Sequence, residues 1–318
     1  MILSIIIQVY NVEAYVGKCL ASVFETTASL EDFEVIVVND GTKDGSMEVV
    51  RQFTDRSNLT VIEQENQGLS VARMKGLSVA KGDFVWFVDS DDWLVEDGVG
   101  KVLTLLGDRQ NASVLMFPLQ YNYEDRSKSF RDYRLEKERT ASGRDIIRDL
   151  GFSVTSAQRY VIRRSLFSDS RLYFPSGCLF EDVYFSAVLI TIVEQFHLLT
   201  DPVYCYQVRE GSIMRTLKVR SCYDMISVHK MVMRLKKKAL NSSDWPWFDR
   251  YYFRHLVFAY KRMREHFHSP AFRWFALTRG PYVWVQWRSI HSEASWKTSL
   301  KYLRAFLLPE RLPALMKL

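Results

Sequence analysis

The chain has 318 residues, of which 47% are hydrophobic and 25% charged, a composition that excludes a disordered protein. Its net charge of +6 is unevenly distributed: residues 1–214 hold 22 basic and 31 acidic side chains, whereas residues 215–318 hold 21 and 6, a net of +15. The longest apolar stretch, residues 183–193, is too short to cross a bilayer, the start lacks signal-peptide features, and the four cysteines have no paired spacing. These features predict a cytoplasmic protein with reduced thiols.

The first hundred residues predict alternating strands and helices. Apolar, mostly β-branched runs indicate strands at residues 3–9, 34–39, 59–63 and 84–88. Helices are expected between them, at residues 12–22, 44–55 and 69–80. This order predicts an α/β fold with a doubly wound, mostly parallel sheet, and such sheets bind ligands beyond the carboxyl ends of their strands.

The remaining chain is predicted to contain a charged segment, then further helices and strands, and finally a basic helical region. Residues 120–148 are highly charged and without periodicity, which predicts an exposed excursion. Structure is expected to resume at 156–167, with a helix at 183–193 and a strand at 202–208. From about residue 221 the pattern is helical and basic. We therefore expect one domain over residues 1–216 and a helical, basic, aromatic-rich region over residues 217–318.

An aspartate cluster follows the fourth predicted strand. Asp89, Asp91 and Asp92 come directly after the sequence FVWFV. Carboxylates on such a turn can face one hard cation, and oxygen ligands suit Mg²⁺ or Mn²⁺. A helix N-cap is the alternative, but three acids in four residues concentrate more like charge than capping needs. The cluster therefore predicts metal binding.

Three further polar residues are candidates for donor binding. Tyr10 follows the first strand, where its ring can stack on a nucleobase, and Asp40 follows the second, where its carboxylate can accept a hydrogen bond from a base. Arg73, on the helix after Gly68, can contact phosphate or base oxygens. Taken singly, these would be read as a surface tyrosine, an Asp-Gly turn and a solvated cation. Their shared position at strand exits favours a site.

These segments resemble the successive motifs of the family 2 inverting glycosyltransferases. The resemblance spans residues 1–216 and is carried, in order, by SIIIQVYNVEAYVGKCLASV, VIVVNDGTKDGS, ENQGLSVARMKGL, FVWFVDSDDWL, FPSGCLFEDVYFSAVL and PVYCYQVREGSIMR, the last two being similar to bacterial polysaccharide-assembly members. It implies a glycosyltransferase A-type fold, a nucleotide-sugar donor, with UDP favoured, and inversion at the anomeric carbon. Gln8 departs from the residues that the family commonly has there.

The resemblance also implies roles for individual residues. Tyr10 and Asp40 would surround the nucleobase and ribose, Arg73 the base or phosphate side, and Asp89 the donor, with Asp91 and Asp92 nearest the metal. Asp182 matches the catalytic base, with Glu181 as the possible substitute, and a helix start rich in acids is the ordinary alternative. A loop closing over the diphosphate would contain Arg209, Ser212 and Arg215, and a solvated basic loop is the alternative for these residues.

The resulting hypothesis is a metal-dependent enzyme that moves a hexose, N-acetylhexosamine or uronic acid from a nucleotide-diphosphate sugar to a glycan or lipid-linked glycan in surface polysaccharide synthesis. A catalytically silent sugar-nucleotide-binding subunit is one alternative, against which the intact acidic residues argue. A nucleotidyltransferase is another, but QVYNVEAY lacks the Gly-rich loop expected after the first strand.

The basic C-terminal region suggests a surface role. Six of the eight tryptophans lie in residues 215–318, interleaved with Arg and Lys. Helices of this kind can lie in a membrane interface and attract anionic lipid. Packing on the catalytic domain or an oligomer contact is the alternative. Nucleic-acid binding is disfavoured because no RNA-binding motif is present. We expect peripheral association with the inner face of the cytoplasmic membrane.

Overall fold

A computed structural model describes residues 1–108, 112–123, 126–150, 155–208, 219–239, 248–249 and 252. The chain divides into two compact units: residues 1–177 with 185–210, and residues 178–184 with 211–318. The predicted division after residue 216 was drawn on sequence alone, and the second unit also takes in the short segment 178–184.

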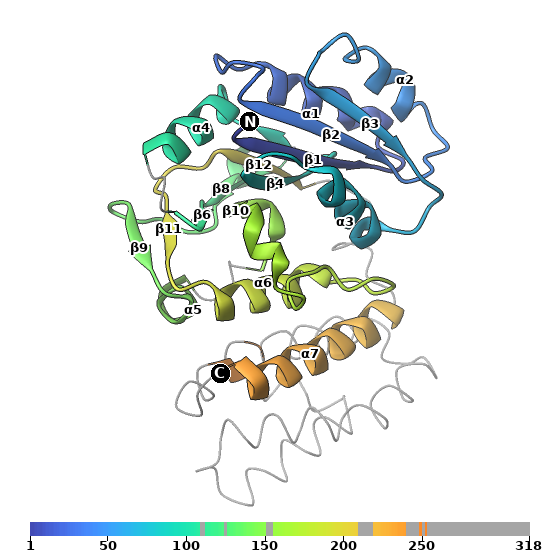
Figure 1. The fold of residues 1–318 in the computed structure, drawn as a ribbon. Coiled ribbons are helices and arrows are strands. Elements are labelled where there is room, and N and C mark those ends of the chain that lie inside the picture. Colours follow the sequence, from blue (N-terminus) through green and yellow to red (C-terminus); the bar gives the residue numbers. More distant parts are fainter. Residues whose placement is uncertain are drawn as a thin grey trace, which may run out of the picture. The chain divides into compact units, whose positions relative to one another are not determined.

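The first half of the first unit has the predicted alternation of strands and helices. Its strands are β1 (Leu3–Val9), β2 (Phe33–Asn39), β3 (Leu59–Glu63) and β4 (Phe84–Asp89). Its helices are α1 (Glu13–Phe24), α2 (Ser46–Arg51), α3 (Leu69–Val79) and α4 (Gly98–Asp108). The strands pair in parallel in the order β3-β2-β1-β4, and Figure 1 shows this part in blue to teal. The carboxyl ends of β1, β2 and β4 therefore share one edge.

The two faces of this sheet are covered by different helices. Because strand side chains alternate, one set from β1, β2 and β4 packs with α1, α2 and α4 in the main core. The other face receives α3, whose Gly76 comes so close that an added Cβ would lie 2.4 Å from Ile6. This close contact holds α3 directly on the sheet.

The second half completes two sheets. The further strands are β5 (Trp93–Leu94), β6 (Val114–Met116), β7 (Leu119–Tyr123), β8 (Phe130–Arg131), β9 (Arg139–Ala141), β10 (Tyr160–Arg163), β11 (Phe196–Leu198) and β12 (Tyr204–Val208). The main sheet has the order β3-β2-β1-β4-β10-β6-β11-β9, with β10 antiparallel to both its neighbours, and a second sheet has the order β5-β12-β7-β8. The predicted α/β class is confirmed, with a mixed rather than parallel second half.

Residues 120–148 are not the exposed excursion that the sequence predicted. The segment contains most of β7, all of β8 and β9, and most of helix α5 (Gly143–Leu150), besides a short 3-10 helix at Arg126–Lys128. Two buried charges hold it: the Arg159 guanidinium pairs with Asp132, and Asp132 accepts a hydrogen bond from the Leu119 main chain at 3.0 Å. The strands β8 and β9 are too short to show the alternation of apolar and polar residues that is typical of a strand. The high charge of the segment therefore led to a wrong prediction.

Among the described residues, helices α6 (Glu181–Ile192) and α7 (Val219–Ala239) contribute to the second unit. α6 begins there and continues into the first unit. Lys236 of α7 is buried and its Nζ lies 2.5 Å from Asp249 Oδ1, so this lysine serves the interior of the unit. Across the part of the chain that the structure describes, no helix is long and apolar enough to span a membrane. All four cysteines are free thiols.

Candidate active site

The loop after β1 presents Tyr10 to solvent. Its side chain is 44% exposed, and the next residue, Asn11, has a positive φ of 52°. The loop is anchored on the turn after β2, where Thr42, Asp44 and Ser46 accept hydrogen bonds from the main-chain N–H groups of residues 11, 13 and 12 at 2.7, 3.0 and 3.0 Å. The loop backbone is therefore fixed by hydrogen bonds, and the exposed Tyr10 ring can stack on a planar ligand.

Asp44 does most of this anchoring. Burial raises the pKa of its carboxyl, but hydrogen bonds from Ser46, Thr42 and the Glu13 main chain outweigh that effect and lower the pKa to about 2. A carboxylate held in this way is charged at neutral pH and accepts several donors at once. The sequence analysis did not predict this anchoring role of Asp44.

Asp40 lies at the end of β2 and organises the turn before α3. It is 3% exposed, and its carboxylate accepts hydrogen bonds at 2.8 Å from the Gln64 side chain and from the main-chain N–H groups of Gln67 and Gly68. Gly41, with φ +67°, passes so close to this turn that an added Cβ would lie 2.9 Å from the Asn66 nitrogen. The predicted donor-binding aspartate thus already supports the backbone at the sheet edge.

Arg73 lies beneath the site rather than on its surface. It is 2% exposed, its Nη2 is 2.7 Å from Asp89 Oδ1, and its guanidinium lies 4.9 Å above the centre of the Phe174 ring. Two glutamine amides complete the surroundings of Asp89: Gln8 Nε2 donates to Oδ1 at 2.5 Å, and Gln158 Nε2 donates to Oδ2. Gln8, which departs from the family pattern, therefore stabilises the Asp89 carboxylate by a hydrogen bond. Gln158 does the same, although it belongs to none of the sequence motifs.

Asp92 is also buried, and both of its oxygens are occupied. Tyr204 Oη donates to Oδ2 at 2.6 Å and the Gln207 main chain donates to Oδ1 at 2.7 Å, while the Asp89 N–H donates to Tyr204 Oη at 3.1 Å. Burial, with the charges of Asp91 and Asp89, raises the pKa of Asp92, and these hydrogen bonds only partly oppose it. Asp92 thus joins β12 to the turn formed by residues 89–92, which we call the acidic turn. The sequence predicted a strand at residues 202–208, but it did not predict that Tyr204 would contact Asp92.

Asp91, like Asp89, is partly exposed, whereas Asp92 is buried. The charge of Asp91 raises the pKa of Asp92, and after burial the charges of Asp92, Asp91 and Asp89 raise the pKa of the Cys19 thiol. In the described residues no group of three or more His, Cys, Asp or Glu side chains could by itself hold a metal ion. The hard carboxylate oxygen and the excess of negative charge nevertheless fit a divalent cation that takes its other ligands from a substrate or water.

Glu181 and Asp182 form the first turn of α6, within the second unit. Glu181 is 8% exposed, whereas Asp182 is partly exposed. The turn before them has two positive φ angles, at Gly177 and Phe180, and the Leu179 N–H donates to Asp224 Oδ2 at 3.3 Å. Of the two acids, Asp182 is the more accessible to a substrate. Arg209, Ser212 and Arg215 lie outside the described residues.

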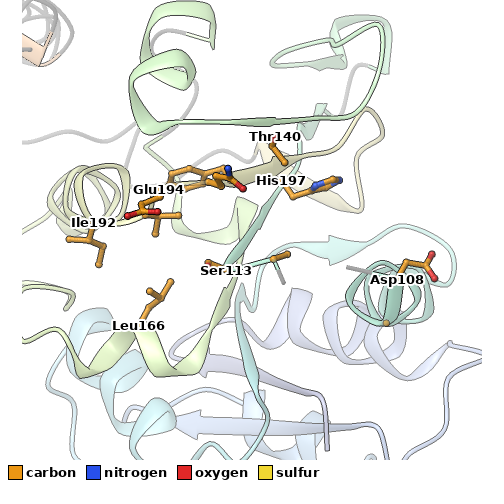
Figure 2. Close-up of a pocket in the computed structure, with 12 residues that line it drawn as sticks. Asp108, Ser113, Thr140, Leu166, Ile192, Glu194 and His197 are labelled. Atoms are coloured by element: carbon orange, nitrogen blue, oxygen red, sulfur yellow. The ribbon is translucent and has the colours of Figure 1, made fainter. Parts of the chain in front are cut away.

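A separate pocket of about 810 Å³ lies at the other edge of the main sheet, where β6 and β11 begin. Figure 2 shows His197 and Glu194 among its lining side chains. β6 runs in the same direction as β4, because both pair antiparallel with β10. This pocket is therefore distinct from the candidate site, and none of the predicted site residues lines it.

The sequence and the fold are similar to those of known proteins. The model of glycosyl transferase family 2 matches residues 4–170. The chain belongs to this family.

Similar sequences are bacterial glycosyltransferases. The chain is 32% identical over 224 residues to glycosyltransferase GlyA of Streptococcus pneumoniae, covering 67% of this chain and 31% of that one. It is 30% identical over 219 residues to the glycosyltransferase EpsJ of Bacillus subtilis, covering 67% and 62%. The chain thus spans about a third to three fifths of the length of these relatives.

Similar solved structures show the same fold. Staphylococcus aureus TarS residues 1–349 in complex with UDP-GlcNAc has a TM-score of 0.70 at 22% identity, covering 99% of this chain and 84% of that one. The mannosyltransferase PcManGT of Pyrobaculum calidifontis, in complex with GDP-Man and Mn²⁺, has a TM-score of 0.54 at 17% identity, covering 98% and 86%. The expected nucleotide-diphospho-sugar transferase fold of this family is confirmed.

Proposed function

We propose that this protein transfers a sugar from a UDP-sugar to a glycan or lipid-linked glycan acceptor, with inversion, in bacterial surface polysaccharide synthesis. The observation that carries the proposal is the meeting of Tyr10, Asp40 and the acidic turn at one edge of a family 2 sheet. The relatives support the class: TarS is named a poly(ribitol-phosphate) beta-N-acetylglucosaminyltransferase, and it was solved with UDP-GlcNAc.

Each residue has a proposed task. Tyr10 stacks on the base and Asp40 holds the turn beside it. Asp91 binds Mn²⁺ or Mg²⁺, which when bound would neutralise charge on the donor diphosphate. Asp89, with Arg73 behind it, faces the donor, and Asp92 positions the turn beside the metal through the hydrogen bonds that its two oxygens accept.

Asp182 is proposed as the general base that takes the proton from the acceptor hydroxyl. Its exposure relative to Glu181 supports this choice. Arg209 and Ser212 are proposed donor contacts on the sequence pattern alone. We propose that residues 1–216 carry the chemistry and that residues 217–318 form an appended region. Hydrolysis of one sugar nucleotide from a panel, without acceptor, would separate an active enzyme from a silent binding subunit.

The metal proposal predicts that UDP binds tightly only with a divalent cation. Calorimetric titration of UDP should give a much weaker affinity with chelator than with Mn²⁺, and Asp91→Asn should abolish the difference. Asp55→Asn is the matched control, because Asp55 is 81% exposed and beside only Arg56. Equal affinities for UDP in chelator and in Mn²⁺ would refute the metal site.

Peripheral membrane association is proposed for the basic C-terminal region. Residues 215–318 carry a net charge of +15, and each Lys or Arg near an anionic surface contributes about 1 kcal/mol of attraction that salt screens. The full chain should co-sediment with vesicles containing anionic lipid at low salt and be released at high salt. Neutral vesicles are the control. A chain that stays in the supernatant with anionic vesicles at low salt contradicts the proposal.

A further inference from the structure

Three aromatic side chains form a continuous row across the second sheet. Tyr206 on β12, Tyr121 on β7 and Phe130 on β8 are direct neighbours in register. The ring centres of Tyr206 and Tyr121 are 5.0 Å apart, and those of Tyr121 and Phe130 are 4.9 Å apart with planes only 3° from parallel. We call these three residues the aromatic row.

The outer end of the aromatic row is open to solvent. Phe130 is 46% exposed, and among the described residues Tyr10 is the other aromatic side chain of comparable exposure. β8 is the last strand of its sheet, so no strand of the described structure covers the outer face of the Phe130 ring. A phenylalanine whose role is only to pack in the core would be buried, whereas Phe130 is exposed.

The inner end of the aromatic row begins beside the acidic turn. Tyr204 and Tyr206 point to the same side of β12, because side chains alternate along a strand, and the Tyr204 hydroxyl contacts both Asp89 and Asp92. The main-chain N–H of Gln207, the residue after Tyr206, donates to Asp92 Oδ1 at 2.7 Å, so Tyr206 lies beside that carboxylate. The aromatic row therefore leads from the candidate site to the surface.

We propose that the aromatic row binds the acceptor, as a chain of neutral pyranose sugars, through the open face of Phe130 and the tyrosine rings behind it. One face of a pyranose consists largely of C–H groups that pack on an aromatic face, while tyrosine hydroxyls offer polar contacts to its edges. A polymer of phosphates would instead need cations, and Arg131 on β8 is paired with Asp201 at 3.2 Å. This inference rests on the proposed glycosyl transfer.

Saturation-transfer NMR on the whole chain can test the proposal without turnover. The probes are the tetrasaccharides cellotetraose, laminaritetraose, chitotetraose and maltotetraose, and a poly(ribitol-phosphate). The wild type should bind at least one tetrasaccharide, with stronger transfer on aromatic than on methyl irradiation. Phe130→Leu should weaken that binding about two- to tenfold, the usual range for a lost aromatic contact, whereas Phe130→Tyr should retain it. Leu30→Ala, at another exposed apolar side chain, should change nothing.

Binding of UDP with Mn²⁺, measured on the same samples, separates the two proposals. If the wild type binds UDP but no tetrasaccharide, or if Phe130→Leu binds tetrasaccharide as the wild type does, the aromatic row is not the acceptor site and the proposed function stands. Preferential, Phe130-dependent binding of poly(ribitol-phosphate) would also overturn the inference. Failure of the wild type to bind UDP would refute the proposed function itself. Should Phe130→Leu not fold, the aromatic-selective transfer in the wild type decides.

Discussion

Replacing Asp182 with asparagine is expected to lower the rate of sugar transfer by about 10²–10⁴-fold, the usual contribution of a general base. Asparagine keeps the shape of the side chain but cannot take a proton from the acceptor. Because the change lies in the first turn of α6 rather than at the strand ends, the affinity for UDP in Mn²⁺ should stay close to that of the wild type. Initial rates with saturating donor, beside calorimetry with UDP, would measure both quantities.

Glu181→Gln is the matched control for this experiment. Glu181 precedes Asp182 in the same turn but is only 8% exposed, so its amide variant should keep most of the activity if it folds. The assignment of the base would be wrong if Asp182→Asn transferred sugar at the wild-type rate. A loss confined to Glu181→Gln would then move the proton acceptor by one residue.

Replacing Arg73 with methionine is expected to cost about 3–5 kcal/mol of the free energy of unfolding, as the breaking of a buried ion pair usually does. The guanidinium is 2% exposed and pairs with Asp89 at 2.7 Å. Methionine would fill much of the same space over Phe174 but leave the carboxylate without its cation. Denaturant titration of both proteins would give the difference.

The exposed pair of Arg51 with Glu48 provides the control. Their side chains are 68% and 66% exposed, and such pairs contribute about 0–1 kcal/mol, so Arg51→Met should be nearly neutral. If Arg73 instead contacts the donor directly, as the sequence pattern predicted, Arg73→Met would leave stability nearly unchanged and weaken only UDP binding. The two outcomes distinguish a supporting arginine from a binding one.

The sheet could be predicted from sequence because its buried strands are long and apolar. The bounds of β1 and β3 were predicted to the residue, and those of β2 and β4 to within one residue. Strands of two or three residues, such as β8 and β9, carry no measurable period, so the charged second half was misjudged. Periodicity reports burial only where an element is long enough to repeat.

The sequence indicated candidate residues at the strand ends, but not the environments of those residues. A motif shows which residue types follow a strand, whereas burial depends on partners far along the chain. Arg73 was expected to contact the donor, and its side chain is buried beside Asp89 on α3, the helix that Gly76 brings onto the sheet. Asp92 was expected to bind metal and is held by Tyr204, 112 residues away. Gln158 and Tyr204 belong to no motif, so only the fold could bring them to the acidic turn.

The position of β10 has a consequence for the order in which the protein can assemble during synthesis. β1 to β4 pair with one another within the first 89 residues, so they can form a sheet as soon as they leave the ribosome. β6 cannot join that sheet directly, because β10 lies between it and β4. It must wait for residues 160–163, and β9 must wait for β11. The nascent chain can therefore bring Tyr10 and Asp40 to one edge of the sheet while the remainder is still unmade, whereas the contacts of Asp89 with Gln158 and Tyr204 form later.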